Sequence, residues 1–256
     1  MQLYQNQTLL INVSTGKINS SQRNNEYVHR NSSGQIDVSA STMCNFTSLV
    51  MAAEYNGWNL PTGKFNQPED NFAEFTMNSV DVDLFYKTKM PSLYADYKAE
   101  KLDENGKIAY YTPNEVHAVL AYAFNLWVGC TNADTFKTNV KLDEIIEHLL
   151  QNRALVLSGI FNGLGHMVTL VGSEFEVKTP EVFNVESALK FIKENGLRPK
   201  NWIIDDPYGN YHNGYTPGQS GNDIKIPHAD FVEMIKPCRD NLAKWAHIIQ
   251  NGAAVI

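Results

Sequence analysis

Three residues of the sequence, Cys44, His166 and Asp206, have the chemical types that acyl transfer by a cysteine nucleophile requires. In such chemistry a thiolate attacks a carbonyl carbon, an imidazole carries the proton, and a carboxylate orients the imidazole. Taken singly, each has an ordinary structural explanation, because buried cysteines, surface histidines and Asp-Pro turns are all common. Their order along the chain, and the segments that hold them, are what indicate a shared site.

Cys44 stands where an amphipathic helix over about residues 44–56 is predicted to begin. Apolar residues follow it with the three- and four-residue spacing of one buried helix face, at Phe46, Leu49, Val50 and Ala53. Gly57 is placed to end the helix. A thiol on the first turn lies near the positive end of the helix dipole and near unpaired backbone N–H groups. Both favour the thiolate, which is the nucleophilic form.

His166 and Asp206 are expected at the ends of two strands. His166 begins a predicted strand directly after a Gly163-Leu-Gly turn, and Asp205 and Asp206 end the strand predicted after it. If the two strands are neighbours, one carboxylate can accept the proton of His166 Nδ1 and fix the tautomer. The alternative is that the two aspartates only begin the turn at Pro207.

The elements that must position these residues divide the chain by character. Helices are predicted over about 69–78, 92–100, 112–127 and 141–151, and strands over 154–160, 167–172, 201–206 and 224–226, of which the first two form a hairpin. An edge strand is expected within 1–20, a loop over 20–43, helices over 184–195 and 227–235, and a helical tail to about 249. This is an α+β pattern, with a helical N-terminal half packed on one face of an antiparallel sheet in the C-terminal half. We expect a single domain over 1–256, with His166 and Asp206 in the sheet at about 154–226.

The composition limits the classes of partner. The chain has 256 residues and a net charge of −7, so nucleic acid and anionic membranes, which select basic surfaces, are not expected partners. The sequence has no run of about 18 apolar residues, so no membrane-spanning helix is predicted. The first residues lack the basic and apolar regions of a signal peptide, so the protein is expected to be made in the cytoplasm and to leave, if at all, by another route.

No metal, cofactor or disulfide framework is expected. The three cysteines are sparse, and Cys130 and Cys238 are interpreted as buried small side chains. Oxygen-bearing residues at 205, 206, 210 and 223 could attract calcium, but they lack the spacing of a calcium loop. His117 and His148, on predicted helices, are expected to face solvent, while Trp58 and Trp127 are expected in the core.

Four short segments resemble the C39-like peptidase family of papain-like cysteine hydrolases. They are Ser21-Gln-Arg-Asn-Asn25, Thr42-Met-Cys-Asn-Phe-Thr-Ser-Leu-Val-Met51, Gly165-His-Met-Val-Thr-Leu-Val-Gly172, and Ile204-Asp-Asp-Pro-Tyr-Gly-Asn210 with Asn213-Gly-Tyr215. They occur in the family's order and span about residues 20–226. The resemblance implies a papain-like fold, with Cys44 as nucleophile, His166 as general base and Asp206 as orienting carboxylate.

The resemblance also implies an oxyanion donor before the cysteine. Papain-like enzymes use a glutamine shortly before the nucleophile, but Val38 and Ser39 stand near that position here. Gln22 is the better match, and Gln35 competes with it. The chain also has Asn45 where the family commonly has glycine after the cysteine. Asn45 and two tyrosines near Asp206, Tyr208 and Tyr215, are candidate substrate-binding residues; a packed turn is the alternative for the tyrosines.

The expected activity is cleavage of an amide bond through a thioester acyl-enzyme. Because no membrane transporter segment is evident, the resemblance favours a peptidoglycan peptide hydrolase of the phage endolysin type, an endopeptidase or an amidase, which reaches the wall after a holin or lysis releases it. Two alternatives remain open: an intracellular cysteine peptidase acting on a protein, and a catalytically silent C39-like binding domain. Oligomeric state and the bond cleaved are left undetermined by the sequence.

Overall fold

A computed structural model describes residues 2–5, 8–14, 20–100, 113–161, 163–177, 185–235 and 245–252 of the chain. Within these residues the fold is mixed α/β. The helices are α1 (Cys44–Tyr55), α2 (Pro68–Asn78), α3 (Val80–Lys89), α4 (Pro91–Lys98), α5 (Pro113–Trp127), α6 (Leu142–Leu150), α7 (Val185–Glu194) and α8 (His228–Met234). The strands are β1 (Gln2–Gln5), β2 (Thr8–Asn12), β3 (His29–Arg30), β4 (Ile36–Val38), β5 (Asp134–Thr138), β6 (Leu155–Phe161), β7 (Leu164–Glu176), β8 (Asn201–Asp205), β9 (Ile224–Pro227) and β10 (Trp245–Ile249).

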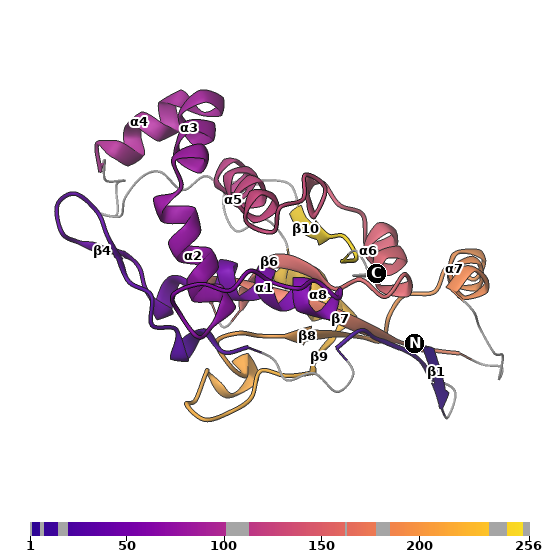
Figure 1. The fold of residues 1–256 in the computed structure, drawn as a ribbon. Coiled ribbons are helices and arrows are strands. Elements are labelled where there is room, and N and C mark those ends of the chain that lie inside the picture. The colour runs from indigo at the N-terminus through magenta and orange to yellow at the C-terminus, as the bar shows by residue number, and fades with distance from the viewer. Residues whose placement is uncertain are drawn as a thin grey trace.

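Eight of these strands form one antiparallel sheet organised around the long strand β7 (Figure 1). β7 pairs with β6 over residues 164–170, with β2 over 172–176 and with β8 over 169–174. Beyond β6 the sheet continues through β10 to β5, and beyond β8 it continues to β9. The sequence placed this sheet in the C-terminal half of the chain. Since β1 and β2 come from the first 12 residues, the sheet is not confined to that half.

Helix α1 is buried on nearly all sides in the centre of the molecule (Figure 1). It contacts β7, β6 and β10 as well as α2. Its polar side chains are satisfied inside the fold: Ser48 Oγ donates to the carbonyl of Met167, and Thr47 Oγ1 accepts from Asn25. The helix was expected to bury only one face. Helices that are covered all round tolerate no charged stripe, and the residues from 45 to 53 contain none.

Helices cover both faces of the sheet. Tyr55 of α1 donates a hydrogen bond to Asp205 of β8 over 2.5 Å. Phe231 of α8 stacks on Trp202 of the same strand, with ring centroids 4.7 Å apart. Residues an odd number of positions apart on a strand point to opposite faces, so α1 and α8 lie on opposite sides. This corrects the expectation of helices on one face only.

The expected elements around the candidate residues are present. A helix begins at Cys44, Gly57 after its end has a φ of +82°, β6 and β7 form the hairpin, and β8 lies beside β7. The segment 20–43, expected to be a loop, contains the β3–β4 hairpin and two short 3-10 helices, Gln22–Asn24 and Ala40–Thr42. Helix α3 and strand β5 were not predicted.

The expected helical tail is wrong. Residues Trp245–Ile249 form β10, which lies between β6 and β5 with all five residues buried. A short run of apolar residues fits a buried helix and a buried strand equally well, so periodicity cannot distinguish them. In the folded chain the strand is favoured because its backbone groups complete the ladders on both sides.

The two histidines on helices, which were expected to face solvent, are less exposed than predicted. His117 is only 5% exposed and its ring lies against Trp245, while the side chain of His148 is 14% exposed. Trp58 and Trp127 pack against the core as expected, and Cys130 is half-buried rather than fully buried. Cys238 and the predicted cap Thr112 lie outside the described residues.

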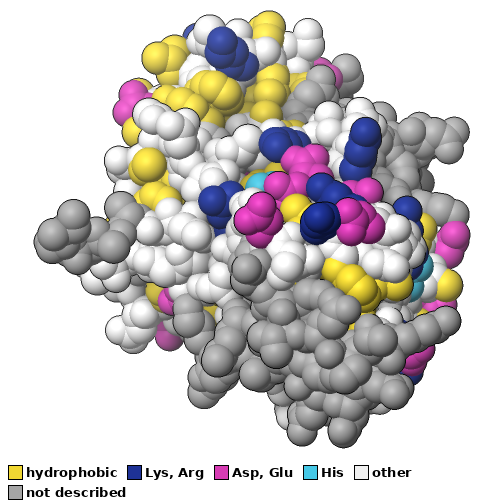
Figure 2. Space-filling model, turned by 90° about the vertical axis from the view of Figure 1, so that its right-hand side faces the viewer, with side chains coloured by type: hydrophobic (Ala, Val, Ile, Leu, Met, Phe, Trp, Pro, Cys, Tyr) yellow, Lys and Arg dark blue, Asp and Glu magenta, His cyan; other side chains and the backbone are white. Residues whose placement is uncertain are grey.

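The surface that carries α6 and α7 mixes both signs of charge. Figure 2 shows basic side chains interleaved with acidic ones on this side of the molecule. Three ion pairs belong to this part of the fold: Lys137–Glu144, Lys193–Glu147 and Arg198–Asp143. These three basic groups are therefore each paired with a carboxylate. Among the described residues, no helix combines the length and apolar character needed to span a membrane.

Candidate active site

Cys44 is the first residue of α1 and is partly exposed. The 3-10 helix Ala40–Thr42 directly precedes it, so the backbone is already helical before Cys44, and the thiol lies at the N-terminus of α1. The first-turn amide groups of a helix have no carbonyl partner one turn back, and the dipole there favours an anion. Most of the other residues of α1 are buried in the core, and this packing fixes the position of the Cys44 sulfur.

His166 approaches the same point from β7. Its side chain is hydrogen-bonded to the thiol of Cys44. Its Nε2 lies 2.7 Å from Oδ1 of Asp206, the residue directly after β8. The pairing of β7 with β8, with Thr169 opposite Asp205, sets the two side chains side by side. The sequence predicted that the carboxylate would bond Nδ1; it bonds Nε2, which leaves Nδ1 as the nitrogen available to Cys44.

The pKa shifts of this pair favour the charged forms. Burial opposes ionisation of Cys44, but the hydrogen bond and positive charge of His166 outweigh it and lower the pKa of the thiol. Burial likewise opposes protonation of His166, yet its bonds to Asp206 and Cys44 raise its pKa to about 10. Both shifts therefore favour a thiolate next to an imidazolium, and Asp206 bonds the other side of the ring.

Asp206 is fully buried and held from several directions. Its Oδ1 also accepts from the backbone N–H of Tyr208 over 2.8 Å, and its Oδ2 accepts from the Tyr215 hydroxyl over 3.2 Å. Its own N–H donates to the carbonyl of Gly221 over 2.9 Å. Burying a carboxylate is costly unless its oxygens have hydrogen-bond partners, and these bonds supply them. Its orientation toward His166 is therefore fixed by the surrounding loop.

The neighbouring Asp205 has a different setting. Its Oδ2 accepts from the Tyr55 hydroxyl and its Oδ1 from the backbone N–H of Asp223, on the opposite face of β8 from the His166 side. Burial raises its pKa to about 6 despite those two bonds. Asp205 thus joins α1 to β8, and the two adjacent aspartates divide into one that holds the helix and one that holds the imidazole.

Gln22 lies next to the candidate residues, and Gln35 does not. The buried Gln22 donates from Nε2 to the carbonyl of Ala40 and from its backbone to the carbonyl of Pro207, over 2.9 Å in each case. It therefore connects the segment before Cys44 with the residue after Asp206. Gln35 is exposed in the β3–β4 hairpin, where its backbone bonds Asn31.

Arg23 and Asn25, in the same Ser-Gln-Arg-Asn-Asn segment, hold the site together, and sequence reasoning gave them no role. Arg23 donates to the carbonyls of Tyr208 and Tyr215, each over 2.7 Å, and its guanidinium lies 4.0 Å from the centre of the Tyr208 ring. Asn25 donates to Thr47 of α1. The only available signal was the resemblance of the whole segment, since these partners are distant in sequence.

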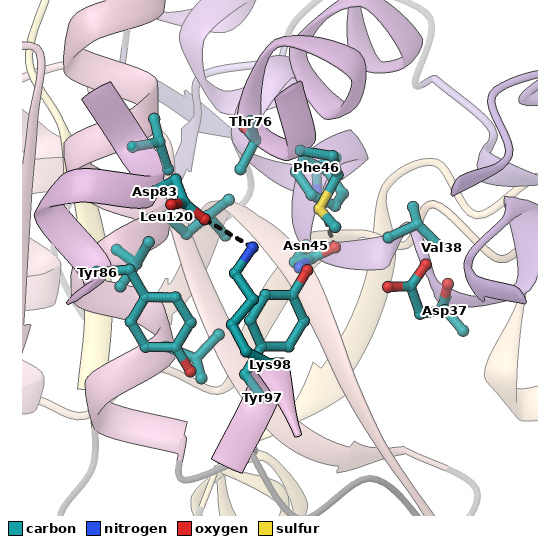
Figure 3. A pocket seen from close by; sticks show the side chains of 15 residues that line it. Asp37, Val38, Asn45, Phe46, Thr76, Asp83, Tyr86, Tyr97, Lys98 and Leu120 are labelled. Atoms are coloured by element: carbon teal, nitrogen blue, oxygen red, sulfur yellow. Dashed lines mark hydrogen bonds and ion pairs between the residues drawn. The ribbon is translucent and has the colours of Figure 1, made fainter. Parts of the chain in front are cut away.

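The three candidate substrate-binding residues have different settings. Tyr208 and Tyr215 are half-buried, and their rings face His166 with centroids 6.3 and 5.8 Å away. Tyr215 has a φ of +60°, a costly conformation for a bulky residue, and its bonds to Arg23 and Asp206 hold it there. Asn45, the residue after Cys44, is buried and lines a pocket (Figure 3).

No group of three or more histidine, cysteine or carboxylate side chains within the described ranges is arranged to hold a metal ion. Comparison with known proteins adds no relative: no family model, curated protein or solved structure matches this chain.

Proposed function

We propose that this protein is a papain-like cysteine hydrolase that cleaves an amide bond through a thioester acyl-enzyme. The observation that carries the proposal is the continuous chain of contacts from Cys44 through His166 to Asp206, at the start of a buried helix. A nucleophile bonded to a base, with the base bonded to a carboxylate, is the arrangement that covalent catalysis requires.

In the proposed first step, the Cys44 thiolate attacks the carbonyl carbon of the scissile amide. The C–N bond then breaks as the His166 imidazolium gives its proton to the leaving amine, and a thioester remains on Cys44. The role of Asp206 is to keep the ring oriented and to stabilise its positive charge before that transfer.

In the second step, water attacks the thioester. His166, now neutral, accepts a proton from the water as its oxygen bonds to the carbonyl carbon, and the C–S bond breaks to return the thiolate. The tetrahedral oxyanion of each step needs donors, for which we propose the backbone N–H of Cys44 and the side chain of Gln22. The position of Gln22 beside the segment that leads to Cys44 supports this choice over Gln35.

For the substrate, we propose a peptide bond or amide of bacterial peptidoglycan, as in an endolysin that acts on the wall after release. The four C39-like segments support this choice, and the central two carry Cys44 and His166. The partly exposed thiol supports a reacting site over a silent binding domain.

Alkylation tests whether the thiol is activated. At pH 6 we expect iodoacetamide to label Cys44 at least about tenfold faster than Cys130, because each unit by which a thiol pKa is lowered gives about tenfold more thiolate. The labelled peptides are quantified by mass spectrometry over time. Replacing the base, in His166→Gln, should slow the labelling of Cys44 and leave that of Cys130 unchanged. Equal rates at Cys44 and Cys130 in the native protein would reject the activated thiolate.

A zymogram on purified bacterial cell walls tests the substrate. We expect clearing by the native protein and none by Cys44→Ala. Clearing by the alanine variant would show a contaminating activity. If the native protein labels rapidly but clears no wall, the substrate is a protein rather than peptidoglycan, and a peptide library becomes the next assay.

A further inference from the structure

A pocket of about 140 Å³ opens between the start of α1 and the helices α3, α4 and α5 (Figure 3). Thr42 and Asn45, on either side of the nucleophile in the sequence, both line it. Its walls are largely apolar, from Val38, Phe46, Met77, Val82, Val119 and Leu120. Its volume suits a side chain rather than a single water molecule.

One wall of this pocket carries a carboxylate with an unused oxygen. The side chain of Asp37 is only 2% exposed, and its Oδ1 lies 2.7 Å from His29 Nδ1. Its Oδ2 is buried and has no hydrogen-bond partner within the described part of the chain. Leaving a buried charged oxygen unpaired is costly, and native folds rarely do so without a reason. In Figure 3 Asp37 lies at the same end of the pocket as Asn45.

The other charged groups of the pocket are already paired. Lys98 Nζ lies 2.9 Å from Oδ1 of Asp83, and the dashed line in Figure 3 marks this pair. The Lys98 side chain is 52% exposed, so solvent also satisfies it. The pocket therefore offers a ligand one unsatisfied buried acceptor, and its one lysine is neutralised by a neighbour.

We propose that this pocket binds the side chain of a basic residue next to the scissile bond of the substrate. The aliphatic stem of a lysine or arginine would pack on the apolar walls, and its cationic head would donate to Asp37 Oδ2. Because consecutive residues of an extended chain advance by about 3.3–3.6 Å each, a pocket that begins at Thr42 and Asn45 is within reach of a residue close to the attacked carbonyl. The inference rests on the proposed function, since it takes Cys44 as the point of attack.

Three matched alkylating probes test the proposal. N-(5-aminopentyl)iodoacetamide, N-hexyliodoacetamide and 6-(iodoacetamido)hexanoic acid carry the same reactive head and stem, and end in an ammonium, a methyl group or a carboxylate. The measured quantity is the labelling rate of Cys44 at pH 7, divided for each probe by the rate of Cys130 in the same sample. We expect the ammonium probe to react at least about tenfold faster than the hexyl probe, and the carboxylate probe to be slowest.

Asp37→Asn should bring the ammonium and hexyl rates to within about twofold of each other, because the amide keeps the shape and removes the charge. Asp143→Asn, which removes an exposed carboxylate paired with Arg198, is the matched control and should keep the native preference. A native circular dichroism spectrum verifies that the Asp37 variant folds. If that variant does not fold, the ratio of the ammonium and hexyl labelling rates in the native protein alone decides whether the proposal holds.

The outcomes separate the two proposals. Equal rates for all three probes, a faster carboxylate probe, or a preference that survives Asp37→Asn would each overturn the basic-side-chain pocket. Slow labelling of Cys44 by plain iodoacetamide would reject the proposed hydrolase instead. The ratio between the ammonium and hexyl probes would still report on the pocket in that case, because it compares two probes at the same thiol.

Discussion

The bond between His166 Nε2 and Asp206 Oδ1 decides which ring nitrogen faces Cys44, and so how the proton is shared. The carboxylate raises the pKa of the imidazole and thereby stabilises the thiolate indirectly. It also lies near the thiolate and repels it slightly, which raises the pKa of the thiol. The effect through the ring is the larger one, because the ring is in direct contact with both groups.

Asp206→Asn should therefore shift the alkylation profile of Cys44 to higher pH. Without the carboxylate, the pKa of His166 falls from its raised value of about 10, and the thiolate forms only at a higher pH. We expect a loss of about tenfold or more in iodoacetamide labelling at pH 6 and little change at pH 9, where the thiol ionises without help. Labelling rates measured across this range give the profile.

Asp205→Asn is the control for that experiment, since the adjacent aspartate bonds Tyr55 and not the imidazole. Its alkylation profile should match that of the native protein. A profile of Asp206→Asn that coincides with the native one would show that Asp206 only packs the loop and does not position the base.

At the scale of single residues, the sequence was informative where chemistry is local. A cysteine at a helix start, a histidine at a strand start and an aspartate before proline can each be read from their neighbours. The roles of Arg23 and Asn25 could not be read in this way. Arg23 bonds residues 185 and 192 positions away, and no local pattern encodes such a contact.

At the scale of elements, the loop from β8 to β9 holds Asp206 through a close backbone approach. Gly221 accepts the N–H of Asp206, and a Cβ on Gly221 would lie 2.0 Å from the Asp206 carbonyl oxygen. Real Cβ atoms do not approach that closely. The position therefore requires glycine for space rather than for a left-handed backbone.

Gly221→Ala should displace the loop and with it Asp206. We expect a destabilisation of about 1–3 kcal/mol and slower labelling of Cys44 at pH 6, both following from the forced backbone shift. Denaturant titration gives the first quantity and mass spectrometry the second. Gly165→Ala is the matched control, because a Cβ at Gly165, next to His166, meets no atom within 4 Å. Equal behaviour of the two variants would contradict the close approach.

Elements with a clear period and clear ends were predictable, and short buried ones were not. The hairpin of β6 and β7 follows from two apolar runs around a glycine turn. β10 has a similar apolar composition, but the pattern could not reveal that β6 and β5 would leave a place for it between them. The position of β10 depends on strands that are distant from it in the sequence, so a local sequence pattern cannot reveal it.

At the scale of the whole molecule, Asn56 connects the end of α1 to the start of β6 and the end of β10. Its Nδ2 donates to the carbonyls of Ala154 and Ile249, over 3.1 and 2.8 Å, and its Oδ1 accepts the N–H of Ala154 over 2.7 Å. The side chain is buried. The helix that carries Cys44 is thus anchored at its far end to the residue before β6 and to the last residue of β10.

Asn56→Ala should destabilise the protein by about 3 kcal/mol or more, because it leaves buried backbone groups of Ala154 and Ile249 without partners. For a chain of this size the melting temperature should fall by about 6–12 °C. Thermal unfolding followed by circular dichroism measures it.

Asn195→Ala is the matched control for this loss. It removes a side chain that bonds only an exposed carbonyl one turn earlier, and it should change stability by less than about 0.5 kcal/mol. A similar small change for Asn56→Ala would contradict the anchoring role.

Because β10 is near the end of the chain, the candidate site residues are synthesised before the sheet that supports them can be completed. A ribosome makes Cys44, His166 and Asp206 before it makes Ile249, yet the strand that contains Ile249 lies between β6 and β5 and anchors α1. Until that strand emerges, β6 and β5 keep unpaired edges, and the helix lacks one of its two anchors. We therefore expect the thiol of the nascent chain to stay unreactive until residues 245–249 have emerged from the ribosome and paired with β6 and β5.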